Sequence, residues 1–356
     1  MLRNTYSLFV TGLCMVLLIS VRAVAVSQTG STADALPKMQ LTMGFFNNQQ
    51  TETGLGQADQ YFAQQVETLS GGRITVDLHP SGSLCAETKC IQDVLQGSLD
   101  IGVSSDSNYG SITPAFYILG MPYLWKDQES QNRILNEWLG PQMDDAVAKS
   151  NLKVLFYLEN DGFRNLWHNE SSDIHVPADA RNIKLRTTNS PVELAIDRAY
   201  EFQPVTVDSR EMFSALGQKV VRGMLNNNEW MVDGRYYEVV PSVSIIGVQI
   251  GYEPVTMRLD KFNGLPVAVK KVLLEAGRRT QLMQQRYMVS VAAQNYKTLE
   301  AHGVKVYKPT NAELSQWTKI APGVWAEFKE QAPPSLIQRI LKLQGCPSTG
   351  CVPAIH

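Results

Sequence analysis

The segment 182–226 constrains the fold more than any other, because short strands and helices alternate strictly along it. Apolar or β-branched runs of strand length lie at 183–185, 202–207 and 220–221. Helix-start signals separate these runs, one near residue 190 and one near residue 208. Strict alternation of this kind is typical of a parallel sheet covered by helices. The sequence therefore predicts an α/β fold.

Two residues with short polar side chains mark the starts of these helices. Ser190 precedes Pro191 and stands three residues before Glu193. We therefore expect a serine N-cap, a proline at the first helical position and a glutamate that bonds back to the cap. Asp208 precedes the second helix as an aspartate N-cap. These caps predict where the loops after the strands end.

Polar residues stand at the carboxyl ends of the predicted strands. Arg186 directly follows the first strand, and Asn226 follows the third. Ligands of open parallel sheets bind at this edge, where loops and helix N-termini meet. Because a guanidinium presents a planar fork of donors that matches a carboxylate, the pattern favours a small organic acid as ligand. The alternative is an ion pair between Arg186 and a neighbouring Asp or Glu.

The same segment resembles the solute-binding proteins of the TRAP (tripartite ATP-independent periplasmic) transporters, typified by the C4-dicarboxylate and sialic acid receptors. Three motifs carry the resemblance: NIKLR at 182–186, SREMFSALGQ at 209–218 and VVRGMLN at 220–226. The third departs from the family pattern and bears on which solute is bound, with Arg222 for Asp, Leu225 for Glu and Asn227 for Pro. The resemblance extends over roughly residues 39 to 330.

This resemblance implies a two-lobed periplasmic solute-binding fold with a long helix that spans both lobes. Helix-spaced apolar residues without an internal proline run from 266 to 302, enough for a helix of roughly 50 Å. The implied first lobe comprises residues 39–161 and 252–290. The second comprises residues 162–251 and 291–345, and a tail follows at 346–356.

The resemblance also implies a binding site between the lobes. Arg186 would form a bidentate bond to the ligand carboxylate from the second lobe. Arg164 would supply a second positive group, or else a salt bridge at the hinge. The remaining expected ligand-binding residues are Asn189, Ser209 and Asn226 from the second lobe and Phe46, Glu87 and Ser105 from the first.

A member of this family is a receptor and not an enzyme. Its lobes would close over the solute and deliver it to the integral-membrane subunits of a TRAP transporter. We expect a monomer without cofactor or metal. A secreted enzyme acting on a small organic acid and an ABC-type binding protein are the alternatives, although the HExxH, GxSxG and phosphate-loop motifs are absent from the sequence.

The N-terminus indicates an exported protein. Arg3 precedes an apolar run at 8–21, and Ala23-Val24-Ala25 supplies a cleavage signal, so residues 1–25 are predicted to be a signal peptide that directs the chain to the periplasm. An uncleaved anchor is the alternative, but the run is only about half to two thirds of a spanning length. The net charge of −2 gives no indication of nucleic-acid binding.

Four cysteines outside the signal peptide form two equally spaced pairs, Cys85 with Cys90 and Cys346 with Cys351. In an oxidising compartment this spacing favours two local disulfides. Cross-pairing of the two segments and a four-thiolate zinc site are the alternatives.

Two further expectations concern packing. The aromatic residues of 114–125 should be core, and Pro322 should kink or divide a helix at 312–329.

Overall fold

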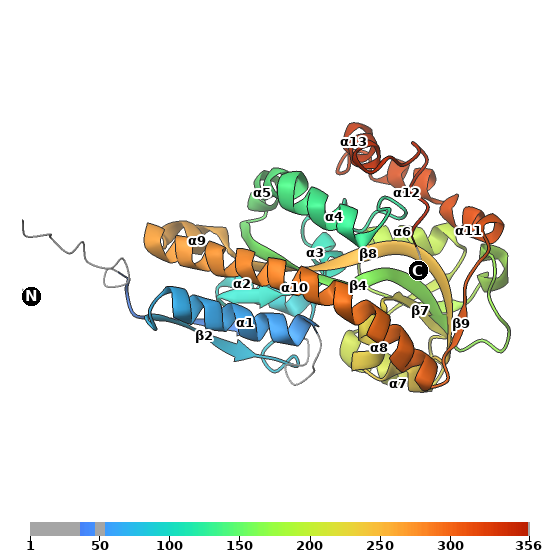
Figure 1. Ribbon diagram of the computed structural model, residues 1–356, viewed down its shortest axis with the longest axis horizontal. Coiled ribbons are helices and arrows are strands. Elements are labelled where there is room, and N and C mark those ends of the chain that lie inside the picture. Colours follow the sequence, from blue (N-terminus) through green and yellow to red (C-terminus); the bar gives the residue numbers. More distant parts are fainter. Residues whose placement is uncertain (1–35, 47–53, 355–356) are drawn as a thin grey trace, which may run out of the picture.

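Two long antiparallel strands form the axis of the molecule. The computed structural model describes residues 36–46 and 54–354, so the predicted signal peptide lies outside the described residues. Strands β4 (Leu152–His168) and β8 (Ser242–Arg258) pair along most of their 17 residues each. The register shifts between Glu159 and Phe163, near the middle of β4. Both strands pass through the two halves of the protein (Figure 1).

The first half extends the sheet from the N-terminal part of β4 and the C-terminal part of β8. Strands β1 (Met39–Gly44) and β2 (Ile74–His79) pair in parallel, and β3 (Ile101–Val103) joins β1 to β8. The helices here are α1 (Gly54–Leu69), α2 (Thr88–Gln96), α3 (Asp106–Gly110) and α9 (Leu259–Gly264). The core between sheet and helices includes a contact between Phe62 and Phe156 with ring centroids 4.8 Å apart.

The second half contains the predicted alternating segment. Its parallel strands are β5 (Lys184–Thr187), β6 (Gln203–Thr206) and β7 (Gly223–Asn226), separated by helices α6 (Pro191–Ala199) and α7 (Ser209–Gly217). Strand β9 (Lys305–Tyr307) pairs with β8. Over the described residues one mixed sheet results, in the order β2-β1-β3-β8-β4-β7-β5-β6 with β9 beside β8. The predicted α/β alternation is confirmed.

Two local expectations in this segment are wrong. One concerns the start of the third strand, and the other concerns the bond of Glu193 back to the helix cap. The third strand begins at Gly223 and not at Val220, because the amides of Val220 and Val221 bond the carbonyl of Ala215 and close the end of α7. The caps Ser190 and Asp208 accept from the amides of Glu193 and Arg210, as expected.

The Glu193 carboxylate, however, does not return to the cap amide. The Ser190 amide instead donates to Thr188 Oγ1 at 3.2 Å. A buried arginine and two hydroxyl groups attract the Glu193 carboxylate away from the helix start.

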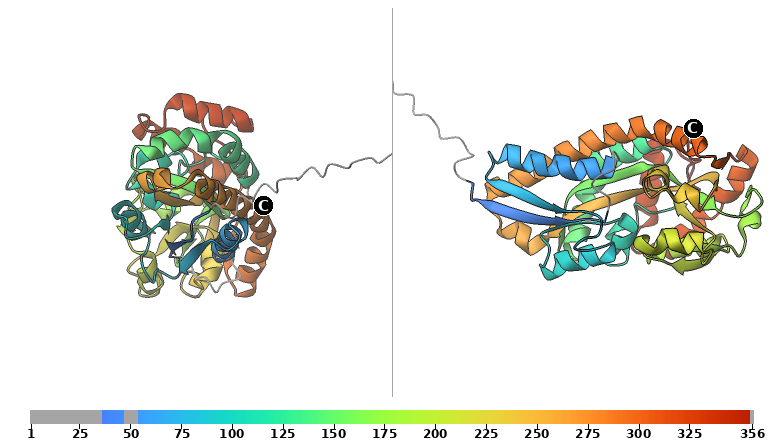
Figure 2. Two further views of the ribbon diagram at one scale, coloured as in Figure 1. Left: turned by 90° about the vertical axis from the view of Figure 1, so that its left-hand side faces the viewer. Right: turned by 90° about the horizontal axis from the view of Figure 1, so that it is seen from below.

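One long helix joins the two halves. Helix α10 (Val267–Ala301) packs on α1 and β4 and reaches α8 (Asn228–Asp233) in the second half. It runs along the length of the molecule in the right-hand view of Figure 2. The predicted long helix is confirmed. Within residues 36–46 and 54–354, none of the helices, α10 included, combines the length and apolarity needed to cross a membrane.

The remaining helices cover one side of the second half and the middle of the sheet. They are α4 (Gln128–Ile134), α5 (Gly140–Ala148), α11 (Asn311–Thr318), α12 (Ala321–Glu327) and α13 (Pro334–Gln344). Pro322 lies in the first turn of α12, so the predicted division of the helix at 312–329 is confirmed. Phe116, Tyr123 and Trp125 are buried, as expected, whereas Tyr117 is only half-buried and packs against this core.

Both cysteine pairs form local disulfides. Cys85 bonds Cys90 at the start of α2, and Cys346 bonds Cys351 after α13. The Cys351 amide donates to the carbonyl of Tyr123, which attaches the second loop to the core. The predicted local pairing is confirmed, and cross-pairing and a thiolate zinc site are excluded because all four sulfur atoms are used.

Candidate ligand-binding site

A small cavity lies where the carboxyl ends of the strands from both halves meet. The space inside it that the centre of a water molecule can reach is about 30 Å³, far below the roughly 300–1,000 Å³ of pockets that hold small ligands. Fourteen of the described residues line it: Phe46, Glu87, Ser105, Asn108, Asn160, Arg164, Arg186, Thr188, Ser209, Met212, Leu225, Asn226, Trp230 and Glu253. An organic acid would fit only after side chains or lobes move.

Most of the residues predicted from the sequence meet in this cavity. They are Phe46, Glu87, Ser105, Arg164, Arg186, Ser209 and Asn226. Asn189 does not line it. That residue lies in a separate hollow with Ser111, Pro191 and Arg198, so its role in binding stays a prediction.

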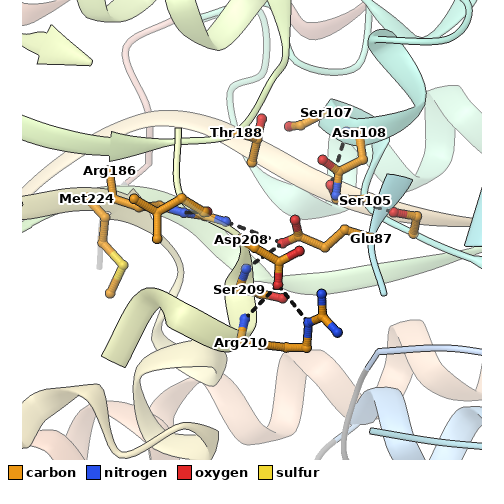
Figure 3. A network of polar contacts seen from close by, with 12 residues as sticks. Glu87, Ser105, Ser107, Asn108, Arg186, Thr188, Asp208, Ser209, Arg210 and Met224 are labelled. Carbon is orange, nitrogen blue, oxygen red and sulfur yellow. Dashed lines mark hydrogen bonds and ion pairs between the residues drawn. The ribbon is translucent and has the colours of Figure 1, made fainter. Parts of the chain in front are cut away.

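Arg186 is held in a defined orientation at the end of β5. Its Nε donates to the carbonyl of Val207 at 3.0 Å, and its Nη2 donates to Glu87 Oε1 at 3.3 Å. The side chain is 10% exposed. Figure 3 shows the guanidinium directed toward Glu87, which comes from the other half of the protein. The Val207 carbonyl therefore orients the arginine, and a carboxylate occupies its free edge.

Glu87 brings this carboxylate from the disulfide-closed loop before α2. Its Oε1 also accepts from the Ser209 amide at 3.2 Å, at the first residue of α7. Burial raises the pKa of the Glu87 carboxyl, and the charge of Arg186 offsets only part of that rise. The backbone of Glu87 has φ 46° and ψ −122°, a conformation that non-glycine residues adopt rarely and at a cost in energy.

Arg164 on β4 forms a second, more deeply buried ion pair. Its Nη1 contacts Glu193 Oε1, and both side chains are 8% exposed. The same carboxylate accepts from Ser107 Oγ at 2.6 Å and from the amide and Oγ1 of Thr188. Burial would raise the pKa of Glu193, but Arg164 and these hydroxyl groups hold it below its usual value. Glu193 therefore stays ionised and fixed.

An aromatic pair closes one side of the cavity. The rings of Phe46, after β1, and Trp230, on α8, stack with centroids 5.4 Å apart and an interplanar angle of 19°. Trp230 thus lines the cavity, whereas Arg222 pairs with Glu170 at 2.8 Å in another hollow. The stack and the Arg186–Glu87 pair both join the first half to the second.

Sequence reasoning missed several lining residues. Asn108, Asn160, Thr188, Met212, Leu225 and Glu253 were not among the predicted ligand-binding residues. Thr188 could have been found, because it follows Arg186 by two residues in the same strand-end loop. Glu253 lies on β8, which carried no strand-end signal. Within the described parts of the chain, His, Cys, Asp and Glu side chains form no group that could hold a metal ion.

Comparison with protein families gives one match that covers most of the chain. The family described as bacterial extracellular solute-binding protein, family 7, matches residues 46–331. A 2,3-diketo-L-gulonate-binding periplasmic protein of Escherichia coli is 23% identical, over 85% of this chain and 86% of its own length. A C4-dicarboxylate-binding protein of Bacillus subtilis is 24% identical, over 82% of this chain and 83% of its own.

Solved structures share the fold. A TRAP periplasmic solute-binding protein from Roseobacter denitrificans with bound β-D-glucuronate has a TM-score of 0.79 at 23% identity, covering 85% of this chain and 98% of that one. A sugar acid binding protein from Advenella mimigardefordensis in complex with galactonate has a TM-score of 0.81 at 22% identity, covering 87% and 99%. The predicted two-lobed fold with a long helix is therefore confirmed.

Proposed function

The chain belongs to family 7 of the bacterial extracellular solute-binding proteins, and on this premise we propose that it is a receptor for a small organic acid. The observation that carries the proposal is the fixed orientation of the Arg186 side chain. Its guanidinium is fixed by the Val207 carbonyl and turned into a cavity between the lobes. A cation oriented in this way can bind a ligand carboxylate in place of the Glu87 carboxylate that it holds in this structure.

The groups around Arg186 support the same ligand class. The Ser209 amide at the start of α7 offers a second donor to an anion. Asn226 and Ser105 supply neutral hydrogen-bonding groups. Relatives and neighbours are named for ligands that carry a carboxylate, among them C4-dicarboxylates, galactonate and succinate. In this proposal the ligand carboxylate binds Arg186 and the Ser209 amide.

Binding would be coupled to closure of the lobes. The proposed first lobe comprises residues 39–161 and 252–290, and the second comprises residues 162–251 and 291–345. The irregular register of β4 between Glu159 and Phe163 lies at their boundary, where a change in strand bending would move one lobe against the other. A ligand that contacts both lobes shifts the population toward the closed form.

The location and partners follow from the family. We propose that residues 1–25 are removed on export to the periplasm, and that the closed receptor acts as a monomer. It would dock on the integral-membrane subunits of a TRAP transporter, which take over the solute. In this role the protein binds its ligand without converting it and needs neither nucleic acid nor cofactor.

A thermal-shift screen against a panel of carboxylates tests this function. We expect at least one acid to raise the melting temperature, and Arg186→Ala to weaken its binding by about tenfold or more, because a charge-assisted bond is lost. Arg210→Ala is the matched control, since Arg210 is exposed on α7 and pairs with Asp208 outside the cavity. An acid that stabilises Arg186→Ala as well as the parent would contradict the assignment.

A further inference from the structure

The positive charges of the cavity are already balanced by glutamates. Arg186 pairs with Glu87, and Arg164 pairs with Glu193. Glu253, which is 1% exposed, also lines the cavity. A ligand with one carboxylate therefore enters a site without surplus positive charge, and a ligand with two would bring in still more negative charge.

Glu87 occupies the place that a ligand carboxylate would take. It accepts from Arg186 Nη2 and from the Ser209 amide, the same two donors that would bind the ligand. Figure 3 shows both contacts converging on its carboxylate. A ligand carboxylate that bonded these same two donors would lie directly against the Glu87 carboxylate, and two like charges in contact repel each other. Glu87 must leave before an organic acid binds.

Several features of Glu87 favour displacement of its side chain from Arg186 and the Ser209 amide. Its side chain is 14% exposed and extends from a short loop on the other lobe. The raised pKa means that the ionised carboxylate is held less favourably here than in water. Its positive φ adds strain to the backbone. An incoming carboxylate can therefore displace it toward solvent.

Glu193 cannot leave in the same way. Arg164, Ser107 Oγ and two groups of Thr188 all donate to its carboxylate, and the residue is buried on α6. Arg164 therefore remains neutralised when the ligand binds. Among the described residues that line the cavity, a second carboxylate of the ligand would find no unpaired cation, while the displaced Glu87 would still lie nearby.

We propose that the site selects hydroxylated monocarboxylates over dicarboxylates, and that Glu87 and Glu193 are the residues that exclude the second carboxylate. The inference rests on the proposed function, since it takes Arg186 as the anchor. The neutral groups of Ser105, Asn108, Asn160 and Asn226 match the hydroxyl groups of such a ligand. Sugar acids of the galactonate and glucuronate type have this chemistry.

Isothermal titration with galactonate, glucuronate, galacturonate and erythronate, compared with succinate, tests the selection. We expect the parent protein to bind at least one of the four sugar acids about tenfold or more tightly than succinate. The inference would be overturned if the protein bound succinate as tightly as it bound each of the four sugar acids. Failure of all four sugar acids to bind would overturn it too.

The variant Glu87→Gln tests whether Glu87 is responsible for this selection. Because Glu87 stabilises only the ligand-free form, we expect the variant to bind sugar acids several-fold more tightly. Succinate should gain about tenfold more than the sugar acids, since the repulsion of its second carboxylate is removed. Glu87→Gly is the second variant, because glycine accepts the positive φ, and Glu211→Gln on the exposed face of α7 is the control. An unchanged ratio of affinities, or weaker binding of both ligands, would overturn the inference.

Arg186→Ala separates this inference from the proposed function. If Arg186→Ala binds the carboxylates as the parent does, the anchor is wrong and the proposed function loses its support. If Arg186→Ala loses binding but Glu87→Gln leaves the selectivity unchanged, only the selection by Glu87 is wrong.

Discussion

At the scale of single residues, Glu193 connects elements that are distant in the sequence. Its carboxylate joins α6 to Arg164 on β4 and to Ser107 on α3. A buried charge pair of this kind is costly to break, because removing one partner leaves the other charge desolvated. The residue therefore matters for stability as well as for the charge of the site.

Glu193→Ala should lower the free energy of unfolding by about 3–5 kcal/mol, since Arg164 would be left buried without its partner. Urea denaturation followed by circular dichroism measures the change. Glu201→Ala is the matched control, because Glu201 pairs with Arg181 in an exposed ion pair, and we expect little change there. Equal effects of the two substitutions would show that the buried pair contributes no more than the surface pair.

Residue-scale prediction from the sequence succeeded where a local signal existed. Arg186 was expected directly after a strand and lies inside β5, one residue before its end, while Ser190 and Asp208 followed from their spacing to the helices. The partner of Arg186 could not be predicted, because Glu87 lies 99 positions away in sequence. The bonding partner of the Glu193 carboxylate was missed for the same reason. The cap motif is local, whereas Arg164, the strongest partner of Glu193, comes from another element.

At the scale of elements, the contact between α10 and β4 depends on a glycine. A Cβ on Gly277 would lie 2.7 Å from Phe156 Cδ1 and 2.9 Å from the carbonyl oxygen of Leu155. The second atom belongs to the backbone of the central sheet and cannot move aside easily. The long helix therefore packs on the strand at a distance that only glycine allows.

Gly277→Ala should destabilise the protein, although alanine is the better helix former. The helix would have to move away from β4, and we expect a lower midpoint in urea denaturation. Gly323→Ala is the control, because no atom lies within 4 Å of a Cβ at this position in α12. There the helix propensity alone should raise stability by roughly 0.5–1 kcal/mol. A stabilised Gly277→Ala variant would contradict the close packing.

Elements with a clear periodicity could be predicted, and those without it could not. The alternating segment and α10 were found from their helix spacing and strand runs. Strand β8 was missed because nearly all of it is buried on both faces, so it lacks the alternation of polar and apolar residues that marks a half-exposed strand. For strand β4, the sequence of residues 153–157 predicts a strand, but Asn160, Asp161 and Gly162 suggest a turn where the strand continues through an irregularity.

At the scale of the whole molecule, the two lobes touch through few side chains near the cavity. The contacts described above that join them are the Phe46–Trp230 stack, the bonds of Glu87 to Arg186 and the Ser209 amide, and the bond of Ser107 to Glu193. They hold the lobes together around a cavity too small for an organic acid. Closure therefore has a contribution from the protein itself, in addition to the contribution of a ligand.

Trp230→Ala should shift the ligand-free protein toward the open form, because a stacked aromatic pair contributes about 0.5–1.5 kcal/mol beyond its buried area. Small-angle X-ray scattering would show a larger radius of gyration than in the parent. Trp138→Ala is the control, since Trp138 packs against Arg339 away from the cavity. An unchanged radius in Trp230→Ala would mean that the stack does not hold the lobes.

The sharing of β4 and β8 by both lobes also governs how the chain can fold. Strand β3 at 101–103 needs its partner at 255–257, which the chain supplies about 150 positions later. Neither lobe can complete its sheet until most of the polypeptide is present, and contacts so distant in sequence form slowly. A fragment that ends before residue 242 would leave unpaired strand edges in both halves, so the protein must acquire its structure as one unit.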